Sequence, residues 1–301
     1  MNKKHFLITG GSGFIGSRLI PVLLMQGYHV TILTRDPDKT NKHFEYAVDV
    51  IEQLEDLKDN DTFDVVINLA GQGITDKRWT PAVKKQLYDS RINTTQKLIN
   101  YFKHASKKPD VFISGSAIGY YGYKSNRPLD ETASGDESFS SQLCKSWEHE
   151  ARSAEEQGIR TCYLRTGIVL GKNGGALSKM LPAFRLGLGG PMGSGKQVMS
   201  WIHIDDLVNM ILFVIENEHI RGPVNGTSPN PVSNKVFSET LGHVLKRPVF
   251  FKVPGFVLKL MLGGMAEELL LSGQTVIPAM VLDAGYEFQF AELKDALVNV
   301  L

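Results

Sequence analysis

The chain has 301 residues, of which 42% are apolar and 22% charged, and its formal net charge at neutral pH is +1. This composition is that of a soluble globular protein. The near-zero net charge argues against a nucleic acid or an anionic membrane as a partner, and no run of about 18 uncharged apolar residues predicts a membrane span.

The N-terminal stretch predicts a strand, a glycine turn and a helix. A short apolar run at 6–8 precedes Gly10, Gly13 and Gly16, and apolar residues then recur at helical spacing over 14–24. This order is the context that a dinucleotide fingerprint requires. The first glycine would turn the chain, the second would let a pyrophosphate approach the backbone, and the third would let the helix pack closely. An ordinary glycine-rich turn without a ligand is the alternative.

The first half of the chain alternates predicted strands and helices. Strands are expected at 30–33, at 64–71, where the strand leaves into a loop, and at 111–114 and 161–165. One long helix or two are expected at 82–104, and one helix at 141–157. Strands separated by helices indicate a parallel sheet that is covered on both faces. We therefore expect an α/β fold with a Rossmann-type doubly wound parallel sheet, whose ligands bind at the carboxyl ends of the strands.

The second half is less regular and predicts a smaller α/β lobe. The glycine-rich stretch 167–195 contains a helical piece at 180–184, and further elements are a helix at 236–245, a strand at 249–253 and helices at 258–271 and 291–301. The apolar stretch 256–271 holds three charged residues, which favours an amphipathic helix on the body of the protein over a membrane span. We place a soft boundary near 170, so that 1–170 bind the cofactor and 171–301 form a substrate lobe. The chain is expected to cross back into the first domain.

Cysteine usage and the N-terminus bear on the compartment. Cys144 and Cys162 are too few for a disulfide framework, and no group of His and Cys has metal-ligand spacing. The first predicted strand leaves no room for a charged and apolar leader. We therefore expect a cytoplasmic protein without a metal site.

The end of the second predicted strand distinguishes NADP from NAD. Arg35 follows Gly16 by 19 positions, and its planar guanidinium suits the 2′-phosphate of NADP. Asp36 comes next, however, and an acidic residue here would favour the 2′-hydroxyl of NAD, so NAD stays open. Asp49, expected after a third strand, could reach the adenine edge. Ala70 and Gly71 could let the adenosine pass close to the backbone.

Several motifs resemble the extended short-chain dehydrogenase/reductases, the superfamily of NAD(P)-dependent epimerases and dehydratases. These motifs lie at 9–16, 68–71, 91–95 and 114–117. Those at 116–122, 164–171, 186–195, 200–207 and 265–270 are similar to one branch, the "epimerase family protein" group with a C-terminal domain of unknown function. Together, the residues named above and the resemblance give a cofactor set of Gly10, Ser12, Gly13, Phe14, Ile15, Gly16, Arg35, Asp49, Leu69, Ala70, Gly71, Asn93 and Lys145.

The resemblance also implies a catalytic serine and a tyrosine that precedes a lysine by four residues. In this superfamily a hydride moves between the nicotinamide and a substrate carbon while the tyrosine exchanges the hydroxyl proton. Ser116 and Lys145 match the serine and the lysine, but Ser141 stands where the tyrosine is expected. Either Tyr120 or Tyr121 supplies a phenol, or Ser141 and Lys145 hold a water that relays the proton. Aromatic packing is the alternative role of the two tyrosines.

Three residues of the second half are candidates for substrate binding. Arg185 and Lys196 flank a glycine-rich loop that could embrace an anionic group, although two solvated surface cations would have the same pattern. His203 precedes Asp205 and Asp206, and a histidine here also suits a structural role at the start of the next helix.

We therefore expect an NADP-dependent oxidoreductase or epimerase that acts on a secondary alcohol or carbonyl of a small polar substrate, such as a nucleotide sugar. The alternative is a non-catalytic NADP-binding sensor or scaffold that has lost its tyrosine. The family resemblance also suggests a homodimer through the two long helices of the first half.

Overall fold

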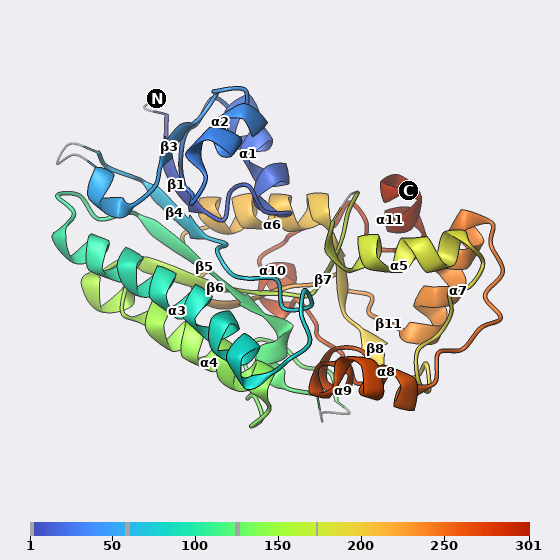
Figure 1. The fold of residues 1–301 in the computed structure, drawn as a ribbon. Coiled ribbons are helices and arrows are strands. Elements are labelled where there is room, and N and C mark those ends of the chain that lie inside the picture. The colour runs from blue at the N-terminus through green and yellow to red at the C-terminus, as the bar shows by residue number, and fades with distance from the viewer. Residues whose placement is uncertain (1–2, 58–60, 124–126, 173) are drawn as a thin grey trace.

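A seven-stranded parallel sheet forms the centre of the computed structural model, which describes residues 3–57, 61–123, 127–172 and 174–301 (Figure 1). The strand order is β10-β6-β5-β4-β1-β2-β3, so the first strand lies inside the sheet and the chain winds outward in both directions. The strands are β1 (His5–Thr9), β2 (His29–Leu33), β3 (Asp49–Ile51), β4 (Val65–Asn68), β5 (Val111–Ala117), β6 (Arg160–Thr166) and β10 (Gly222–Gly226). This is the doubly wound sheet that the sequence predicts.

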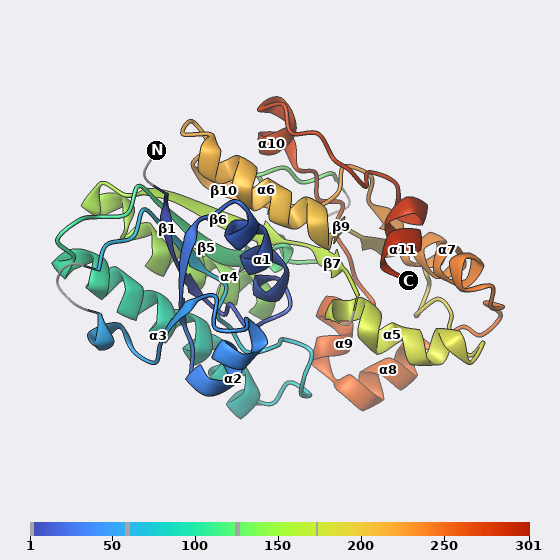
Figure 2. The same cartoon turned by 90° about the horizontal axis from the view of Figure 1, so that it is seen from above.

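Helices cover both faces of the sheet (Figure 2). They are α1 (Gly16–Met25), α2 (Pro37–His43), α3 (Pro81–His104), α4 (Phe139–Arg152) and α6 (Ile204–Glu216). Because side chains alternate along a strand, Phe6 and Ile8 of β1 enter the core beneath α1 and α6, whereas Leu7 enters the core beneath α3 and α4. Both faces of β1 are therefore buried, and its short apolar run has no polar position.

The helical stretch predicted at 82–104 is one long helix, α3. Thr80 caps its N-terminus by accepting a hydrogen bond from the Val83 backbone, and Pro81 occupies its first turn. The second long helix, α4, begins at Phe139 because Ser138 supplies the cap, and it ends at Arg152. The last residues of the predicted stretch form a separate 3₁₀ turn, η3 (Glu155–Gln157).

A second lobe follows β6 and has its own core around the buried rings of Trp201 and Phe237. Its short strands are β7 (Ile168–Leu170), β8 (Val198–Met199), β9 (Trp201–His203) and β11 (Val232–Ser233). Its helices are α5 (Gly175–Arg185), α7 (Asn234–Leu245), α8 (Gly255–Leu262), α9 (Gly264–Leu269), α10 (Ala279–Asp283) and α11 (Leu293–Val300). Both β10 and α6 come after β7 in sequence yet belong to the central sheet and its cover.

Two details of the second lobe differ from the prediction. The stretch 249–253 forms no strand and makes a single bridge, between Met192 and Val253. The predicted helix at 258–271 is two helices, because Gly263 adopts a positive φ of 62° that ends α8. In the part of the chain that the structure describes, no helix has the length and apolarity that a membrane crossing requires.

The two lobes are joined at several places. Met265 of α9 packs against Trp79, Leu87 and Leu143 of the sheet domain. Glu268 accepts hydrogen bonds from the backbone and the hydroxyl of Ser140, at 2.9 and 2.6 Å, in the first turn of α4. A carboxylate is favourable there because a helix N-terminus carries a partial positive charge. The second lobe thus fixes the start of α4.

Candidate functional site

The glycine turn after β1 has the geometry that its spacing predicts. Gly10 has a φ of 69°, and a Cβ on this residue would lie 2.6 Å from the Leu69 carbonyl oxygen. A Cβ on Gly16 would collide with the backbone of Gly11. A Cβ on Gly13, by contrast, would meet only the Gly10 carbonyl oxygen, at 3.0 Å. Two glycines are therefore required by the fold, while the third leaves open space beside the backbone.

Helix α1 begins directly at this turn and presents free donors to it. Its N-cap residue, Ile15, makes no capping hydrogen bond through its side chain, and the first turn holds no acidic residue. Phe14 points to the second lobe instead, since Cβ atoms on Gly171 or Gly175 would lie 2.8 and 2.9 Å from its ring. Gly13, Ser12 and the start of α1 thus form a place for an anionic group.

The segment after β4 closes the other side of the turn. Asn68 accepts a hydrogen bond from the Thr9 hydroxyl at 2.6 Å and donates to the Thr95 hydroxyl at 2.9 Å, and all three residues are buried. The Ala70 backbone donates to the Thr9 hydroxyl at 3.2 Å. These bonds hold Leu69 and Ala70 against Gly10, where the sequence predicts a close approach to the adenosine.

Helix α3 contributes Arg91 to this region rather than Asn93. The Arg91 guanidinium donates to the carbonyl oxygens of Leu87 and Gln72, at 2.9 and 3.0 Å, and fixes the chain next to Gly71. Burial lowers the pKa of Arg91. Asn93 is exposed, because it lies two positions from Arg91 and so points to the other side of the helix. The prediction that Asn93 reaches the cofactor gains no support from this placement.

The two residues at the end of β2 have separate roles. The Asp36 carboxylate caps α2 by accepting a hydrogen bond from the Lys39 backbone at 3.1 Å. Arg35 is exposed, and its guanidinium contacts no acceptor among the residues that the structure describes.

Asp49 lies at the opposite end of the sheet from the turn. It opens β3 rather than following it, and its carboxylate is 2.9 Å from Nε2 of His29. His5, His29 and Asp49 bring their ligand atoms within 4.8 Å of one another. The two rings are stacked, however, with an interplanar angle of 22°, so their nitrogen lone pairs lie in nearly parallel planes and do not converge on one ion. The Asp49 carboxylate is thus engaged by His29, and this placement gives no support to the prediction that Asp49 reaches the adenine.

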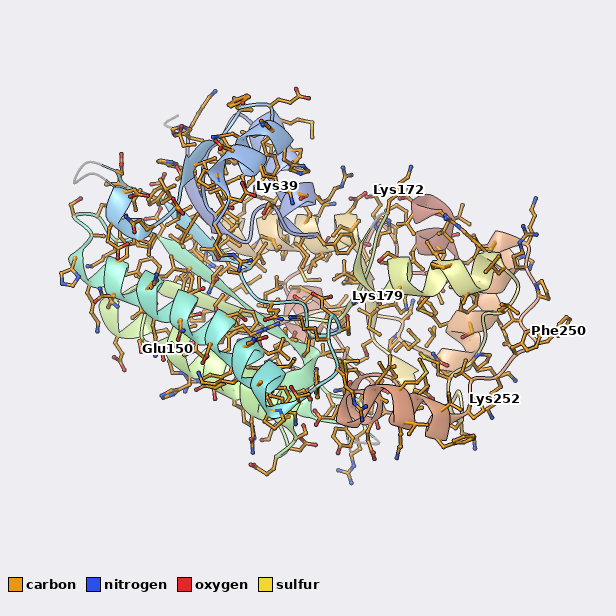
Figure 3. The ribbon with its side chains drawn as sticks, in the orientation of Figure 1. Lys39, Glu150, Lys172, Lys179, Phe250 and Lys252 are labelled. Carbon is orange, nitrogen blue, oxygen red and sulfur yellow. The ribbon has the colours of Figure 1, made fainter. Side chains whose placement is uncertain are left out.

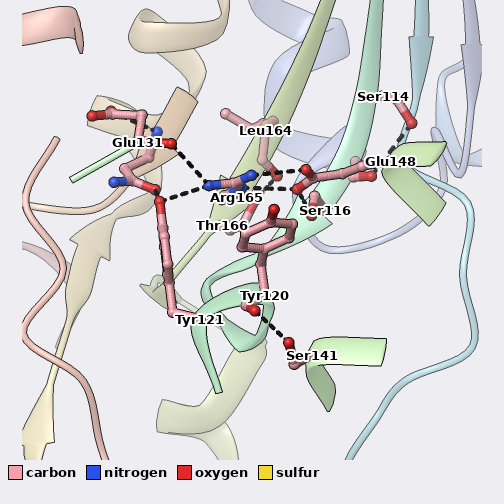
Figure 4. A network of polar contacts seen from close by, with 12 residues as sticks. Ser114, Ser116, Tyr120, Tyr121, Glu131, Ser141, Glu148, Leu164, Arg165 and Thr166 are labelled. Atoms are coloured by element: carbon pink, nitrogen blue, oxygen red, sulfur yellow. Dashed lines mark hydrogen bonds and ion pairs between the residues drawn. The ribbon is translucent and has the colours of Figure 1, made fainter. Parts of the chain in front are cut away.

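Ser116, at the end of β5, belongs to a buried charged network (Figure 4). Its hydroxyl donates to Glu148 of α4 at 2.7 Å. Both carboxylate oxygens of Glu148 also accept bonds from Arg165 of β6, each at 2.8 Å. Burial alone would lower the pKa of Arg165, but the hydrogen bonds and the charge of Glu148 raise it above its ordinary value. Sequence reasoning assigned no role to Glu148 or Arg165, although an arginine inside an apolar strand was a visible signal.

The network gives Tyr120 and Tyr121 different environments. The Tyr121 hydroxyl is buried, donates to Asn225 at 2.7 Å and accepts from Arg165 at 2.9 Å. Burial raises the pKa of Tyr121 to about 12. The ring of Tyr120 is half-buried, and its centroid lies 3.4 Å from the guanidinium carbon of Arg165. Its hydroxyl has no hydrogen-bond partner within the described ranges of the chain.

Ser141 and Lys145 are both bonded to backbone carbonyl oxygens. Ser141 is fully buried, and its hydroxyl donates to the Tyr120 carbonyl oxygen at 2.6 Å. Lys145 donates to the Asp136 carbonyl oxygen at 2.7 Å and lies 3.5 Å from Glu137. A Cβ on Gly135 would lie 2.5 Å from the Ser141 hydroxyl, so this loop also fills the space that a larger side chain at 141 would need.

The side chains of α4 that face Ser116 come one residue before the predicted positions 141 and 145. Ser140, Cys144 and Glu148 follow one another at a spacing of four residues, and Glu148 binds Ser116 directly. Cys144 lies between them, fully buried, and burial raises its pKa to about 11, so the thiol stays protonated at neutral pH. No lysine or tyrosine stands on this face.

The three candidates for substrate binding lie apart. Arg185 is exposed at the end of α5, where its carbonyl oxygen accepts a bond from Arg247. Lys196 lines a pocket of about 320 Å³ together with Tyr123 and Leu271. His203 is fully buried: its Nδ1 caps α6, its Nε2 lies 3.1 Å from Asn299, and its ring stacks on Phe290. His203 therefore has the structural role, and its prediction as a substrate ligand is wrong because no surface of it is left exposed.

Comparison with known proteins agrees with this geometry. The model of the NAD-dependent epimerase/dehydratase family matches residues 6–225. The chain belongs to this family. A second model, of a domain of unknown function, matches residues 253–300. The family match covers the sheet domain through β10, and the second match covers the last four helices.

Relatives extend the similarity over the whole chain. The Bacillus subtilis epimerase family protein YfhF is 38% identical and covers 99% of this chain and 98% of its own. The chloroplastic SDR39U1 homologue of Arabidopsis thaliana is 38% identical over 98% of this chain and 86% of its own. The structure of human epimerase family protein SDR39U1, solved with NADPH, has a TM-score of 0.85 at 34% identity, and the match covers 98% of both chains.

The buried His203 gives the folded state a measurable pH dependence. Burial lowers its pKa below the ordinary value of 6.5, so the unfolded chain binds the proton more tightly than the folded one. The stability contributed by neutral His203 is therefore complete above about pH 6.5 and falls on acidification, by at most about 1.4 kcal/mol per pH unit. His203→Asn keeps a capping oxygen but removes the titration.

We expect wild type to be more stable than His203→Asn near pH 8 and to lose this advantage progressively below about pH 6.5. Urea unfolding across this pH range measures the difference in the free energy of unfolding between the two proteins. The contributions of the other titrating groups are common to both and cancel in this difference. An advantage that stays constant or grows on acidification would mean that the folded protein accepts the charged imidazole.

Proposed function

We propose that this protein is an NADP-dependent oxidoreductase or epimerase that acts on a secondary alcohol or carbonyl of a small polar substrate. The glycine turn carries the proposal: Gly10 and Gly16 are closed in by backbone, while Gly13 faces open space beside the uncapped end of α1. A pyrophosphate requires this combination of close approach and free donors. The similarity to a human protein solved with NADPH supports the same cofactor.

The end of β2 favours NADP over NAD. An acidic residue there would have to bind the ribose hydroxyl, but the carboxylate of Asp36 already caps α2. Arg35 has no acceptor among the described residues, and its guanidinium can pair with a phosphate in a bidentate manner. The separate contacts of these two neighbours support NADP as the cofactor.

Arg35→Ala should weaken NADPH binding by roughly 1.5–3 kcal/mol, the range for a hydrogen bond to a charged group, and should leave NADH binding almost unchanged. Calorimetric titration of cofactor-free protein with each dinucleotide measures both. Lys97→Ala, which removes an exposed cation from the outer side of α3, is the matched control and should change neither. Equal losses for both cofactors in Arg35→Ala would exclude Arg35 as the reader of the 2′-phosphate.

Tyr120 is the best-placed side chain for proton exchange with the substrate. The alternatives are all engaged: Tyr121 by Asn225 and Arg165, and Ser141 by the Tyr120 carbonyl. Tyr120 follows Ser116 by four residues and keeps its hydroxyl free within the described chain. The guanidinium of Arg165 lies against its ring, where a positive charge attracts the negative charge that develops as the phenol loses its proton. When bound, the nicotinamide would supply or accept the hydride.

Tyr120→Phe should lower the turnover number for any carbonyl that wild type reduces by about 10²–10⁴, the usual effect of a general acid, without weakening NADPH binding. Tyr121→Phe is the matched control. Because it leaves a buried acceptor on Asn225 without a donor, it should instead lower the free energy of unfolding by about 1–3 kcal/mol. Unchanged turnover in Tyr120→Phe would exclude this residue from proton transfer.

A second candidate function is a non-catalytic NADP-binding sensor or scaffold. The observation in its favour is the α4 face toward Ser116, which carries Cys144 and Glu148 in place of a tyrosine and a lysine. The two functions differ in one measurable property. An enzyme oxidises bound NADPH with at least one carbonyl of a broad panel, whereas a sensor binds the cofactor and turns over none.

A further inference from the structure

The outer end of the second lobe carries apolar side chains that the described residues leave exposed. In two neighbouring loops, Leu186 and Phe250 are 74% and 86% exposed, and Leu188 and Phe251 are each 55% exposed. The next helix, α8, has no buried residue although most of its residues are apolar, and its Phe256, Leu260 and Met261 are 63–76% exposed. An exposed apolar group of this size is rare on a protein that works without a partner surface.

These segments form one continuous region. The Arg247 side chain donates to the Arg185 carbonyl oxygen at 2.9 Å, and the backbones of Gly193 and Val253 are hydrogen-bonded at 2.8 Å, so the two loops run side by side. Helix α8 begins two residues after Val253. Phe250 and Lys252 project from this end of the molecule, away from the sheet domain (Figure 3). We call the region the basic apolar end, meaning residues 185–188, 246–252 and 256–261.

The charged residues of this region are basic, although the whole chain has a net charge of only +1. The stretches 174–204 and 240–266 contain no Asp or Glu, but they hold Lys179, Arg185, Lys196, Lys246, Arg247, Lys252 and Lys259. Acidic residues from elsewhere pair with two of these cations: Glu267 with Lys259 at 2.9 Å, and Asp76 with Lys179 at 3.0 Å. Arg185, Lys246, Arg247 and Lys252 thus surround the exposed apolar side chains without an acidic neighbour in their own segments.

We propose that the basic apolar end docks on the surface of an anionic lipid bilayer. Phe, Leu and Met side chains enter the interface between headgroups and acyl chains, while Lys and Arg beside them attract anionic headgroups. A second copy of the chain fits less well, because a twofold interface places each patch against itself and would bring these cations together without acids. Single-stranded nucleic acid would leave the aliphatic Leu186, Leu188 and Leu260 in water, since only aromatic rings stack on bases.

Co-sedimentation of the full-length protein with vesicles tests the proposal. Wild type is expected to bind vesicles that contain phosphatidylserine, to bind pure phosphatidylcholine vesicles much more weakly, and to be released by salt. The double variant Phe250→Ser/Phe251→Ser should bind about tenfold less tightly. Lys252→Glu should bind at least about fivefold less tightly.

Two control variants test whether a loss of vesicle binding is specific to the basic apolar end. Met25→Ser removes a side chain of α1 that is 78% exposed, and Lys97→Glu reverses an exposed charge on α3, so both should bind vesicles like wild type. The altered side chains are exposed, and circular dichroism melting checks that every variant folds. Failure of wild type to bind anionic vesicles, or unchanged binding by the double phenylalanine variant, would overturn the proposal.

Two further outcomes would also overturn it. Sedimentation that depends on protein concentration without lipid, and that is lost in the double phenylalanine variant, would assign the surface to a second copy. Binding of a single-stranded oligonucleotide in preference to vesicles would assign it to nucleic acid. Because none of these measurements involves a dinucleotide, the result is independent of the proposed function.

Discussion

The paired charges of Arg165 and Glu148 are the constraint on which the candidate site depends. Both side chains are buried, so each would be costly alone, and removal of one partner from such a pair costs about 3–5 kcal/mol. The pair joins β6 to α4, receives the Ser116 hydroxyl from β5, and positions Tyr121 and Tyr120 through one guanidinium. The positions of Ser116, Tyr120 and Tyr121 at the end of β5 are therefore determined by the neutralisation of two buried charges, and not by the segment that follows β5 itself.

The second lobe takes part in the same arrangement. Glu268 binds the first turn of α4, the helix that carries Glu148, and the adjoining apolar cluster packs α9 against α3 and α4. On the other side, Phe14 of the glycine turn packs under Gly171 and Gly175, where the chain enters the second lobe. The two lobes thus meet at both ends of the candidate site.

The sequence predicted those features that depend on local sterics. The strand, turn and helix at the N-terminus could be predicted because Gly10 and Gly16 leave no room for any other side chain. The charged network was missed because Ser116, Glu148, Arg165 and Asn225 lie far apart in the chain and meet only after the sheet has formed. The contact of Glu148 with Ser116 was missed because Ser141 and Lys145 lie one residue from this face of α4, and one residue along a helix is a rotation of about 100°. The strand at 249–253 was predicted from apolar residues that prove to be exposed, Phe250 and Phe251.

The crystal structure of the protein with NADPH would test the central claim most directly, namely that the turn after β1 binds the phosphates of a dinucleotide. Our account predicts the pyrophosphate beside Gly13, within hydrogen-bond distance of the backbone at the start of α1, and the 2′-phosphate against the guanidinium of Arg35. A dinucleotide bound elsewhere, or a glycine turn that stays empty at saturating NADPH, would contradict it and reduce the turn to a structural role.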